Sequence, residues 1–472
     1  MASTEQDRLF DEELPEQMAP APGGSGRPRL RKAERDQVEL RAVSLDDLVP
    51  ADHRVRLVWA FAEKLDLAPL YAAIKAVEGR PGHPPADPRV LMAAWLYATT
   101  EGVGSARALA RLCREHVAYQ WLCGGVSMNH KTLADFRVDH GALLERLLID
   151  SFAALLKAGI ASLDRVAQDG VRVRASAGAA SFRRRATLEE CRRQAEEEVA
   201  RLRAELEDDP AAASRRQAAA RSRAAADRLR RVNEALAAAE RLDAERKGRE
   251  RKAATGKDAP PRAEGGDAPP SAGSGDTGKG KEAKKREPRA STTDPEARVM
   301  KMPDGGFRPA YNVQFAADPR SGAVAGVSAD NVGSDMGRMA PMNDALAAAY
   351  GRRPGEHLAD GGFAKLDDIE RLAQAEVTPY VPVPAPRNPT RDRHVPHPDD
   401  PPGVAAWRQR MGTDAAKAIY KERAATVECV NAQARNRGLT RFLVRGVEKV
   451  RAVGLWHALT HNMACAWRLA AA

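Results

Sequence analysis

The chain has 472 residues and a mass of 51.0 kDa, enough for two or three domains that each bury a core. Lysine and arginine number 75 against 65 acidic residues, so the net charge of +10 favours polyanionic partners such as nucleic acid. The five cysteines form no C-x-x-C pair, which argues against a disulfide framework or a structural zinc site. The N-terminus lacks an apolar signal region, and the longest apolar stretch is too short for a bilayer, so we expect a cytoplasmic protein without membrane partners.

The first part of the chain is predicted to form a tail and a helical domain. Residues 1–38 are rich in Pro, Gly and charge, and we expect a disordered tail. In residues 39–160 apolar side chains recur at helical spacing, for example in RLVWAFAEKL, PRVLMAAWLYAT and GALLERLLIDSFAALLKAG. Ser105 and Asn129 stand as N-caps before ARALARLCREH and HKTLADFRVDH, with GG between these helices. The pair is either a DNA-binding helix-turn-helix or an ordinary feature of a small helical domain.

Strand patterns begin after the helical domain. Valines alternate with arginines in VAQDGVRVRAS, and Asp169 lies on this predicted strand. AYNVQFAAD and AVAGVSAD are separated by PRSG, which predicts a β-hairpin. A helix over MAPMNDALAAAYG, a short strand EHLAD, a helix around LDDIERLAQAE and a last strand VTPYVPV follow. A closing helical block is predicted from about Asp414.

A long insertion, residues 187–292, separates the first strand from the hairpin. Its first part has apolar residues at helical spacing on both sides of DDPAA, which predicts two antiparallel helices. Its second part, about residues 253–292, is rich in Gly, Pro, Ser and Lys and is expected to be a disordered linker. The basic run KGKEAKKREPR is either solvated linker or a DNA contact. The Leu and Ala faces of the helices permit dimerisation without requiring it.

The order of the predicted elements indicates the fold class. Without the insertion they run strand, strand, strand, helix, strand, helix, strand, helix, which is the arrangement of an RNase H-like mixed α/β sheet. The core would comprise residues 161–186 and 293–472. In such a sheet the first and fourth strands are neighbours, so Asp169 would lie beside Asp360 of HLADGGF. Asp and Gly also dominate turns, and HLADGGF taken alone is compatible with an ordinary turn.

Converging carboxylates suit a hard divalent ion. Mg²⁺ prefers carboxylate and water oxygens, and a pair of such ions can bridge the attacking and leaving oxygens of a phosphodiester. A third acid from the final helix would complete the site. Histidine ligands are a poorer alternative, because His457 and His461 lack the glutamate of H-E-x-x-H and are interpreted as packing residues.

The segment YKERAATVECVNAQARNRGLTRFLVRG resembles the C-terminal signature of bacterial insertion-sequence transposases of the DDE class, in which a Tyr, an Arg, a Glu and a further basic residue recur on one helix. The matching residues are Tyr420, Arg423, Glu428 and Arg435. In some branches the spacing between the Arg and the Glu is one residue shorter, and the last basic residue is often Lys, so the match is to a variant. VAQDGVRVRASAG and LADGGF resemble the strands that carry the two aspartates, and the helical domain resembles the one that precedes catalysis.

The resemblance implies a transposase that cleaves DNA at the ends of its element and transfers the strands to target DNA. Asp169, Asp360 and Glu428 would then be the catalytic residues and would hold two Mg²⁺ ions, with Mn²⁺ as a substitute. The implied partners are the terminal inverted repeats, the target DNA and a second copy of the chain in a synaptic homodimer. The alternative is a non-catalytic, repressor-like DNA-binding protein derived from such an enzyme, and a generic metal-dependent nuclease is a third possibility.

Basic residues surround the predicted third acid. Seven positions separate Glu428 from the next basic residue of the signature, so both lie on one face of a helix, and later arginines continue in steps of four. We expect these arginines to bind DNA, the alternative being a solvated charged face. They are Arg423, Arg435, Arg437, Arg441 and Arg445.

Glu422 competes with Glu428 for the place of the third acid. The two are six positions apart, a rotation of about 240° on an α-helix, so they cannot both face one site. Glu428 matches the signature, whereas Glu422 is flanked by Lys421 and Arg423 and is interpreted as a surface residue paired with nearby cations.

Overall fold

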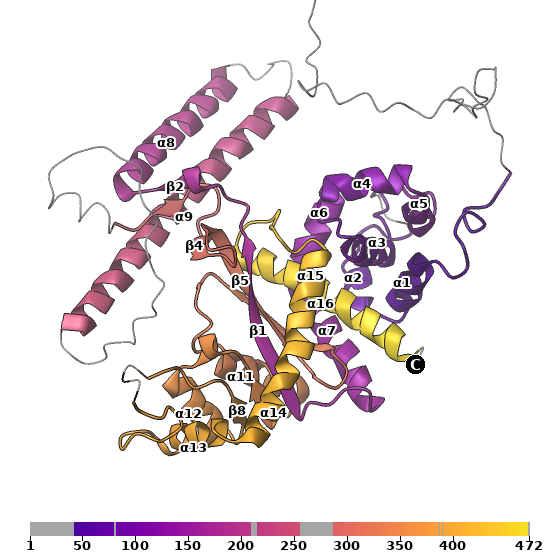
Figure 1. The fold of residues 1–472 in the computed structure, drawn as a ribbon. Helices are drawn as coiled ribbons and strands as arrows, with labels where there is room; N and C mark the ends of the chain where they lie inside the picture. Colours follow the sequence, from indigo (N-terminus) through magenta and orange to yellow (C-terminus); the bar gives the residue numbers. More distant parts are fainter. Residues whose placement is uncertain are drawn as a thin grey trace, which may run out of the picture. The chain divides into compact units, whose positions relative to one another are not determined.

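The computed structural model describes residues 42–79, 82–208, 215–254, 287–386, 388 and 390–470 (Figure 1). The predicted tail, residues 1–38, and most of the predicted linker, residues 253–292, lie outside this part of the chain. All elements below belong to one compact unit, Leu45–Ala472. The boundary at residue 160 therefore stays a prediction.

The N-terminal part of this unit is helical. Its helices are α1 (Arg54–Glu63), α2 (Ala68–Ala72), α3 (Pro88–Thr100), α4 (Ala106–Glu115), α5 (Val117–Cys123), α6 (His130–Asp139) and α7 (Gly141–Lys157). Almost every side chain of α3 is buried, and α1, α5 and α6 pack against it. The Asp87 carboxylate accepts the N–H of Arg89 and caps α3, and Pro88 fills its first position. Because α3 is apolar on all sides, it forms the centre of this helical group.

The predicted helix-turn-helix is altered by an additional helix. Ser105 Oγ accepts the N–H of Ala108 at 3.3 Å and Asn129 Oδ1 accepts that of Lys131 at 2.8 Å, so both predicted N-caps are confirmed. However, α5 stands between α4 and α6 and ends at Gly124, whose φ is +55°. The two capped helices are therefore separated by a helix that was not predicted.

A mixed sheet follows the helices. Its strands are β1 (Arg165–Arg174), β4 (Arg298–Lys301), β5 (Phe307–Ala317), β6 (Val324–Asp330), β7 (Glu356–Leu358) and β8 (Thr378–Tyr380). The strand order is β4-β5-β1-β7-β8, and β6 also pairs with β5. β5 is antiparallel to β1, β4 and β6, whereas β1, β7 and β8 are mutually parallel. The predicted α/β class and the predicted hairpin, β5–β6, are confirmed, and β4 was not predicted as a strand.

Helices cover both faces of this sheet. On the edge strand β6, a side chain at Gly326 would touch Met342 and Leu346 of α11 (Met339–Tyr350). The next residue, Val327, lies on the other face, where a side chain at Gly454 of α16 (Val447–Ala470) would touch it. α11 and α16 therefore lie on opposite faces. Farther along the chain, α12 (Leu366–Gln374) precedes β8, and α13 (Pro402–Met411) begins before the closing helical block was predicted.

Helix α16 joins the N-terminal helices to the sheet, and it runs between them in Figure 1. The Trp456 indole donates to the carbonyl of Arg137 in α6 at 2.9 Å. On the sheet side, the Asn462 amide accepts the Val324 N–H at 2.7 Å and donates to the Val324 carbonyl at 2.8 Å. The Asn462 side chain thus satisfies both backbone polar groups of Val324 at the start of β6.

The insertion forms a helical arm. α8 (Arg185–Asp208) and α9 (Arg215–Ala254) pack against each other, and Figure 1 shows them side by side. Buried residues recur every seven positions on each helix, which is the spacing of a two-stranded coiled coil. They are Leu188, Ala195 and Leu202 on α8, and Ala225, Val232 and Ala239 on α9. The short strands β2 (Phe182–Arg183) and β3 (Ala290–Ser291) pair where the arm leaves the rest of the chain.

Candidate metal and DNA site

The register between β1 and β7 brings two of the predicted acids together. The strands pair in parallel from Arg165 with Glu356 to Ala167 with Leu358. Asp169 lies two positions beyond Ala167, and Asp360 lies two positions beyond Leu358, so the two aspartates are level with each other at the end of β7. The charge of Asp360 also acts on Asp169 and raises its pKa.

Asp169 is partly buried and makes polar contacts on both carboxylate oxygens. Oδ2 accepts a hydrogen bond from Asn431 Nδ2 at 3.1 Å and lies 3.7 Å from Arg423 Nη1, while Oδ1 accepts the N–H of Gly170 at 2.9 Å. Burial and the charge of Asp360 raise the pKa of Asp169 to about 6, against the opposing effect of Arg423. A further cation close to Asp169 would therefore stabilise its ionised carboxylate.

Asp360 caps a turn and also lies beside Asp169, the two placements that its sequence context suggested. Oδ1 accepts the N–H of Gly362 at 2.8 Å and caps the short 3₁₀ turn η2 (Gly361–Phe363), as an ordinary turn aspartate does. Its backbone position beside Asp169 follows from the strand pairing. The turn therefore fixes the orientation of Asp360 without removing it from the neighbourhood of Asp169.

Glu428 is connected to Asp169 through Arg423. It ends a π turn, η3 (Ala424–Glu428), between α14 (Asp414–Arg423) and α15 (Cys429–Asn436). Glu428 Oε1 accepts a hydrogen bond from Arg423 Nη2 at 2.5 Å, and its side chain is 51% exposed. One guanidinium thus pairs with two of the three predicted acids.

Glu422 lies elsewhere. Its carboxylate pairs with Arg165 Nη1 at 2.5 Å, and Arg165 Nε also binds Glu356 at 2.5 Å. Arg165 begins β1 four residues before Asp169, which is about 13 Å along a strand. The expected pairing of Glu422 with Lys421 or Arg423 is replaced by this bridge to β1.

The predicted arginine stripe is not helical. α15 ends at Asn436, so the steps of four between Arg437, Arg441 and Arg445 do not align these side chains on one helix face. Arg437 is half-buried near Cys465, and burial lowers its pKa. Arg441 and Arg445 are exposed, and the chain around Arg441 pairs with the end of β1, where the Phe442 N–H donates to the Arg174 carbonyl at 2.8 Å.

The reason for the helix end is a close approach to the N-terminal helices. Gly438 has a φ of +86°, and a side chain there would meet the carbonyl oxygen of Gly102 at 2.9 Å. A glycine in this conformation stops α15, and the contact depends on tertiary packing. Sequence spacing alone therefore could not predict it.

Asp335 is a further acid near the site that sequence reasoning missed. It accepts hydrogen bonds from Asn312 Nδ2 and Gln314 Nε2, each at 2.6 Å, and its charge also raises the pKa of Asp169. A side chain at Gly170 would collide with this carboxylate. A glycine inside a strand often marks a place where another group packs closely against the backbone. Gly170 was therefore the sign in the sequence that another group lies against β1 at this position.

The carboxylates are chemically suited to a hard cation. Asp169 and Asp360 supply only oxygen donors, the ligand type that Mg²⁺ prefers, and burial together with the charge of Asp360 raises the pKa of Asp169, which a bound cation would offset. Within the described parts of the chain, no three His, Cys, Asp or Glu residues are grouped closely enough to hold a metal ion. The predicted third acid, Glu428, joins the two aspartates through its pair with Arg423.

The predicted packing histidines are buried in α16. His461 Nε2 bonds with the Gly322 carbonyl at 2.8 Å, and burial lowers the pKa of His457 to about 3 and that of His461 to about 4. Neutral, buried rings beside Arg437 form no ligand set for zinc.

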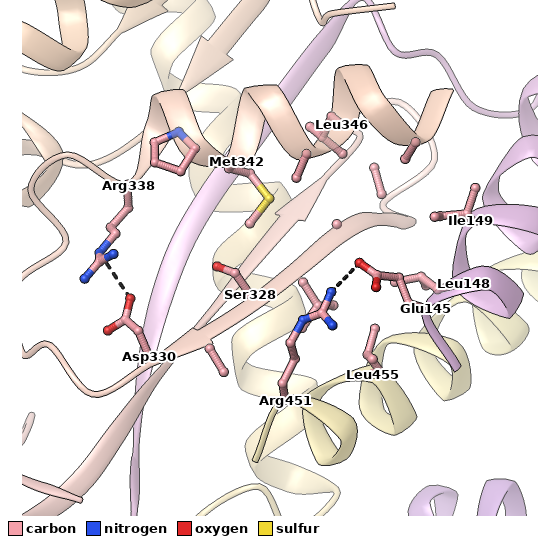
Figure 2. Close-up of a pocket in the computed structure, with 17 residues that line it drawn as sticks. Glu145, Leu148, Ile149, Ser328, Asp330, Arg338, Met342, Leu346, Arg451 and Leu455 are labelled. Atoms are coloured by element: carbon pink, nitrogen blue, oxygen red, sulfur yellow. Dashed lines mark hydrogen bonds and ion pairs between the residues drawn. The ribbon is translucent and has the colours of Figure 1, made fainter. Parts of the chain in front are cut away.

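A pocket along β6 lies apart from these acids. Figure 2 shows its walls, which come from β6, α11, α7 and α16, and its volume is about 220 Å³. Ion pairs border it, Arg338 with Asp330 at 3.1 Å and Arg451 with Glu145. None of its lining residues belongs to the predicted site.

Family models match two parts of the chain. The family described as "Transposase domain (DUF772)" matches residues 43–139, which include α1 to α6. The family described as "Transposase DDE domain" matches residues 402–466, from α13 into α16, including Arg423 and Glu428. No curated protein and no solved structure is similar enough to match. In the described parts of the chain, no helix has both the length and the apolar character needed to cross a bilayer. Both matched models describe transposase domains, and together they support the resemblance to insertion-sequence transposases of the DDE class.

Proposed function

We propose that this protein is a transposase that cleaves DNA at the ends of its element and transfers the strands to target DNA, with Asp169, Asp360 and Glu428 as its metal-binding acids. The observation that carries the proposal is the β1–β7 register, which makes Asp169 and Asp360 neighbours although 191 positions separate them (360 minus 169). Glu428 supports it through the guanidinium that it shares with Asp169.

The strand order supports an RNase H-like core. β6, β5 and β1 are antiparallel neighbours, and β7 and β8 continue the sheet in parallel on the other side of β1. This is the arrangement in which the first and fourth strands of such a domain adjoin. The helix that bears Glu428 contacts β1 through its π turn.

The acids and their neighbours have distinct roles in the proposed reaction. Two Mg²⁺ ions, or Mn²⁺ in their place, would supply activation of a water or a 3′-hydroxyl and stabilisation of the leaving oxygen. Asp169 and Asp360 would hold them from the sheet, and Glu428 would hold them from the helix. Asn431 keeps Asp169 Oδ2 in place by its hydrogen bond, and no covalent link between protein and DNA is required.

A basic surface lies beyond the acids along β1. Arg174 is exposed at the end of the strand, about 16 Å from Asp169 by strand length, and Arg441 and Arg445 are exposed on the segment that pairs there. We propose that these residues, with the exposed Arg435, hold DNA phosphates. The partners would be the terminal inverted repeats and target DNA, with two copies of the chain in the synaptic complex.

A strand-transfer assay with the DNA that flanks the coding region tests the proposal. The wild-type protein should cleave the ends and join them to a target plasmid only when Mg²⁺ or Mn²⁺ is present. Asp169→Asn and Asp360→Asn should bind the same DNA but neither cleave nor join it. Asp367→Asn is the matched control, because this carboxylate is 89% exposed and pairs only loosely with Lys365 at 3.9 Å. DNA binding without cleavage by the wild type would favour a repressor-like protein instead.

A further inference from the structure

The helix that bears Glu428 contains one turn of a different pitch. α14, the π turn η3 and α15 follow one another without a break, and the junction residues Arg423 (φ −54°, ψ −46°) and Cys429 (φ −63°, ψ −43°) both have right-handed helical dihedrals. A π turn closes over five residues instead of four, so it takes in one additional residue without ending the helix. This addition changes which side chains share a face.

The change of register affects the residues that contact Asp169. Arg423 Nη1 lies 3.7 Å from Asp169 Oδ2, and Asn431 Nδ2 donates to the same oxygen at 3.1 Å. Eight positions separate Arg423 from Asn431, which on a regular α-helix is a rotation of about 80° away from a common face. With one residue absorbed by the π turn, they are equivalent to residues seven apart, which differ by only about 20°.

The same holds for Glu428. Residues five apart on a regular α-helix point about 140° apart and do not pair. Arg423 nevertheless donates to Glu428 Oε1 at 2.5 Å, as residues four apart do. The π turn therefore brings the guanidinium, the glutamate and Asn431 onto the face of the helix that meets β1.

The Arg423 side chain is directed inward, toward β1, and not toward solvent. Its side chain is only 12% exposed, and its guanidinium lies 5.7 Å from the centre of the Tyr420 ring. Its Nε is buried without a hydrogen-bond partner, so the contacts of the group are concentrated at the end that faces the two acids. This placement differs from the exposed positions of Arg441 and Arg445.

We propose that Arg423 is a positioning residue that aligns Asp169 with Glu428, and that the additional residue of the π turn keeps Arg423, Glu428 and Asn431 on the face turned to Asp169. The inference rests on the proposed function, because that function makes Asp169 and Glu428 metal ligands. It assigns Arg423 to the site itself, in place of the DNA contact expected from the sequence.

Deletion of one residue tests the role of the π turn. Removal of Ala425, which is exposed within η3, should convert the turn into regular α-helix and preserve the common face. The matched control is removal of Ala418, an exposed alanine in regular α14, which should rotate the two ends of the helix by about 100° relative to each other. The Ala425 deletion should keep its midpoint of thermal unfolding within about 4 °C of wild type. An equal loss in both deletions would overturn the assignment of the π turn.

Substitution of Arg423 separates positioning from DNA binding. Arg423→Gln should slow cleavage at saturating DNA by about 10- to 100-fold, as loss of a residue that orients ligands does, and should leave the half-saturating DNA concentration unchanged. Arg441→Gln should do the reverse, raising the half-saturating concentration and lowering its salt dependence. If Arg423→Gln weakened DNA binding in the manner of Arg441→Gln, Arg423 would be a DNA contact and the proposal would be wrong.

Failure of the proposed function would be visible separately. If the wild type cleaved no DNA with any divalent ion, the catalytic proposal would fail, whereas the unfolding midpoints of the Ala425 and Ala418 deletions would still decide whether the π turn sets the helix register. Arg423→Lys gives a second check on positioning. Lysine lacks the planar fork that reaches two carboxylates, so it should restore little of the lost cleavage rate.

Discussion

At the scale of single residues, charge compensation is the main physical feature of the candidate site. Asp169 and Asp360 are neighbours, and Arg423 is the cation that offsets the pair through its contact with Asp169. The compensation is incomplete, since burial and the charge of Asp360 still raise the pKa of Asp169 to about 6. In the absence of divalent ions the site is therefore a local source of instability.

Asp169→Asn should stabilise the metal-free protein at pH 8. The folded pKa of about 6 lies above the ordinary value of 3.8, so the folded protein binds this proton more tightly than the unfolded chain does. The resulting stability is present at low pH and is lost as the pH rises through 6. Removal of the charge should recover at most about 3 kcal/mol. Denaturant unfolding in EDTA measures the gain, with Asp164→Asn as control, since Asp164 is 81% exposed. A loss of stability in Asp169→Asn would contradict the charge argument.

Gly170→Ala should destabilise the fold by about 1–3 kcal/mol, because the added methyl group meets the Asp335 carboxylate, Gln314 Nε2 at 2.5 Å and Asn312 Oδ1 at 2.8 Å. Gly178→Ala is the matched control, since Gly178 has a φ of −88° and nothing within 4 Å of the added atom. Urea unfolding of both variants provides the comparison. Equal stabilities would mean that Asp335 does not lie against β1.

At the scale of elements, several predictions failed where tertiary contacts control local structure. The strand with Asp169 and the hairpin β5–β6 were evident from alternation and turn residues. The end of α15 was not evident from the sequence, because it depends on the close packing of Gly438 against Gly102. The π turn was equally hidden, although the one-residue-longer spacing between Arg423 and Glu428 coincides with it.

A buried polar chain links β7 to β1 and α11. Asn343 Nδ2 donates to His357 Nδ1 at 2.7 Å, and His357 Nε2 donates to Gln168 Oε1 at 2.9 Å, so the ring is neutral. Burial lowers the pKa of His357 to about 3. This chain fixes β7 beside β1, and hence Asp360 beside Asp169.

The free energy of unfolding should consequently depend on His357 at acid pH. The folded pKa lies below the ordinary 6.5, so the unfolded chain takes up the proton first, and stability falls as the pH drops from about 6.5 towards 3. Between pH 7.5 and 5 this group should cost about 2 kcal/mol. His357→Gln can keep both hydrogen bonds. Between these two pH values, its free energy of unfolding in urea should fall by about 2 kcal/mol less than that of wild type. Identical losses would show that the ring is not held neutral.

At the scale of the whole molecule, the arm differs from the core in sequence pattern and joins it where β2 pairs with β3. Arg183 pairs with Ala290, so the chain leaves and re-enters at adjacent positions, and five buried residues of α8 and α9 form a small cluster with Ala290 of β3. The neighbours of β1 were predictable because the order of the predicted strands and helices resembles an RNase H-like arrangement, whereas the edge strand β4 was missed. The role of the arm was not predictable, since its two helices pack their apolar residues against each other and carry no catalytic signature.

Replacement of residues 184–289 by Asn-Gly should leave a folded protein with metal-dependent cleavage close to wild type. The dipeptide closes a two-residue hairpin between Arg183 and Ala290, which already pair as antiparallel neighbours. Circular dichroism and the cleavage assay measure the outcome. A folded variant that cleaves no DNA would show that the arm takes part in the reaction.

The most direct test of the central claim compares Glu428→Gln with Glu422→Gln in cleavage of the element's own ends with Mg²⁺. Both substitutions remove one carboxylate from the same helix, but only Glu428 shares a guanidinium with Asp169, whereas Glu422 binds Arg165 at the far end of β1. Glu428→Gln should lose cleavage by orders of magnitude at unchanged folding and DNA affinity, and Glu422→Gln should stay near wild type. The reverse ranking would contradict the assignment of Glu428 as the third acid and the metal centre built on it.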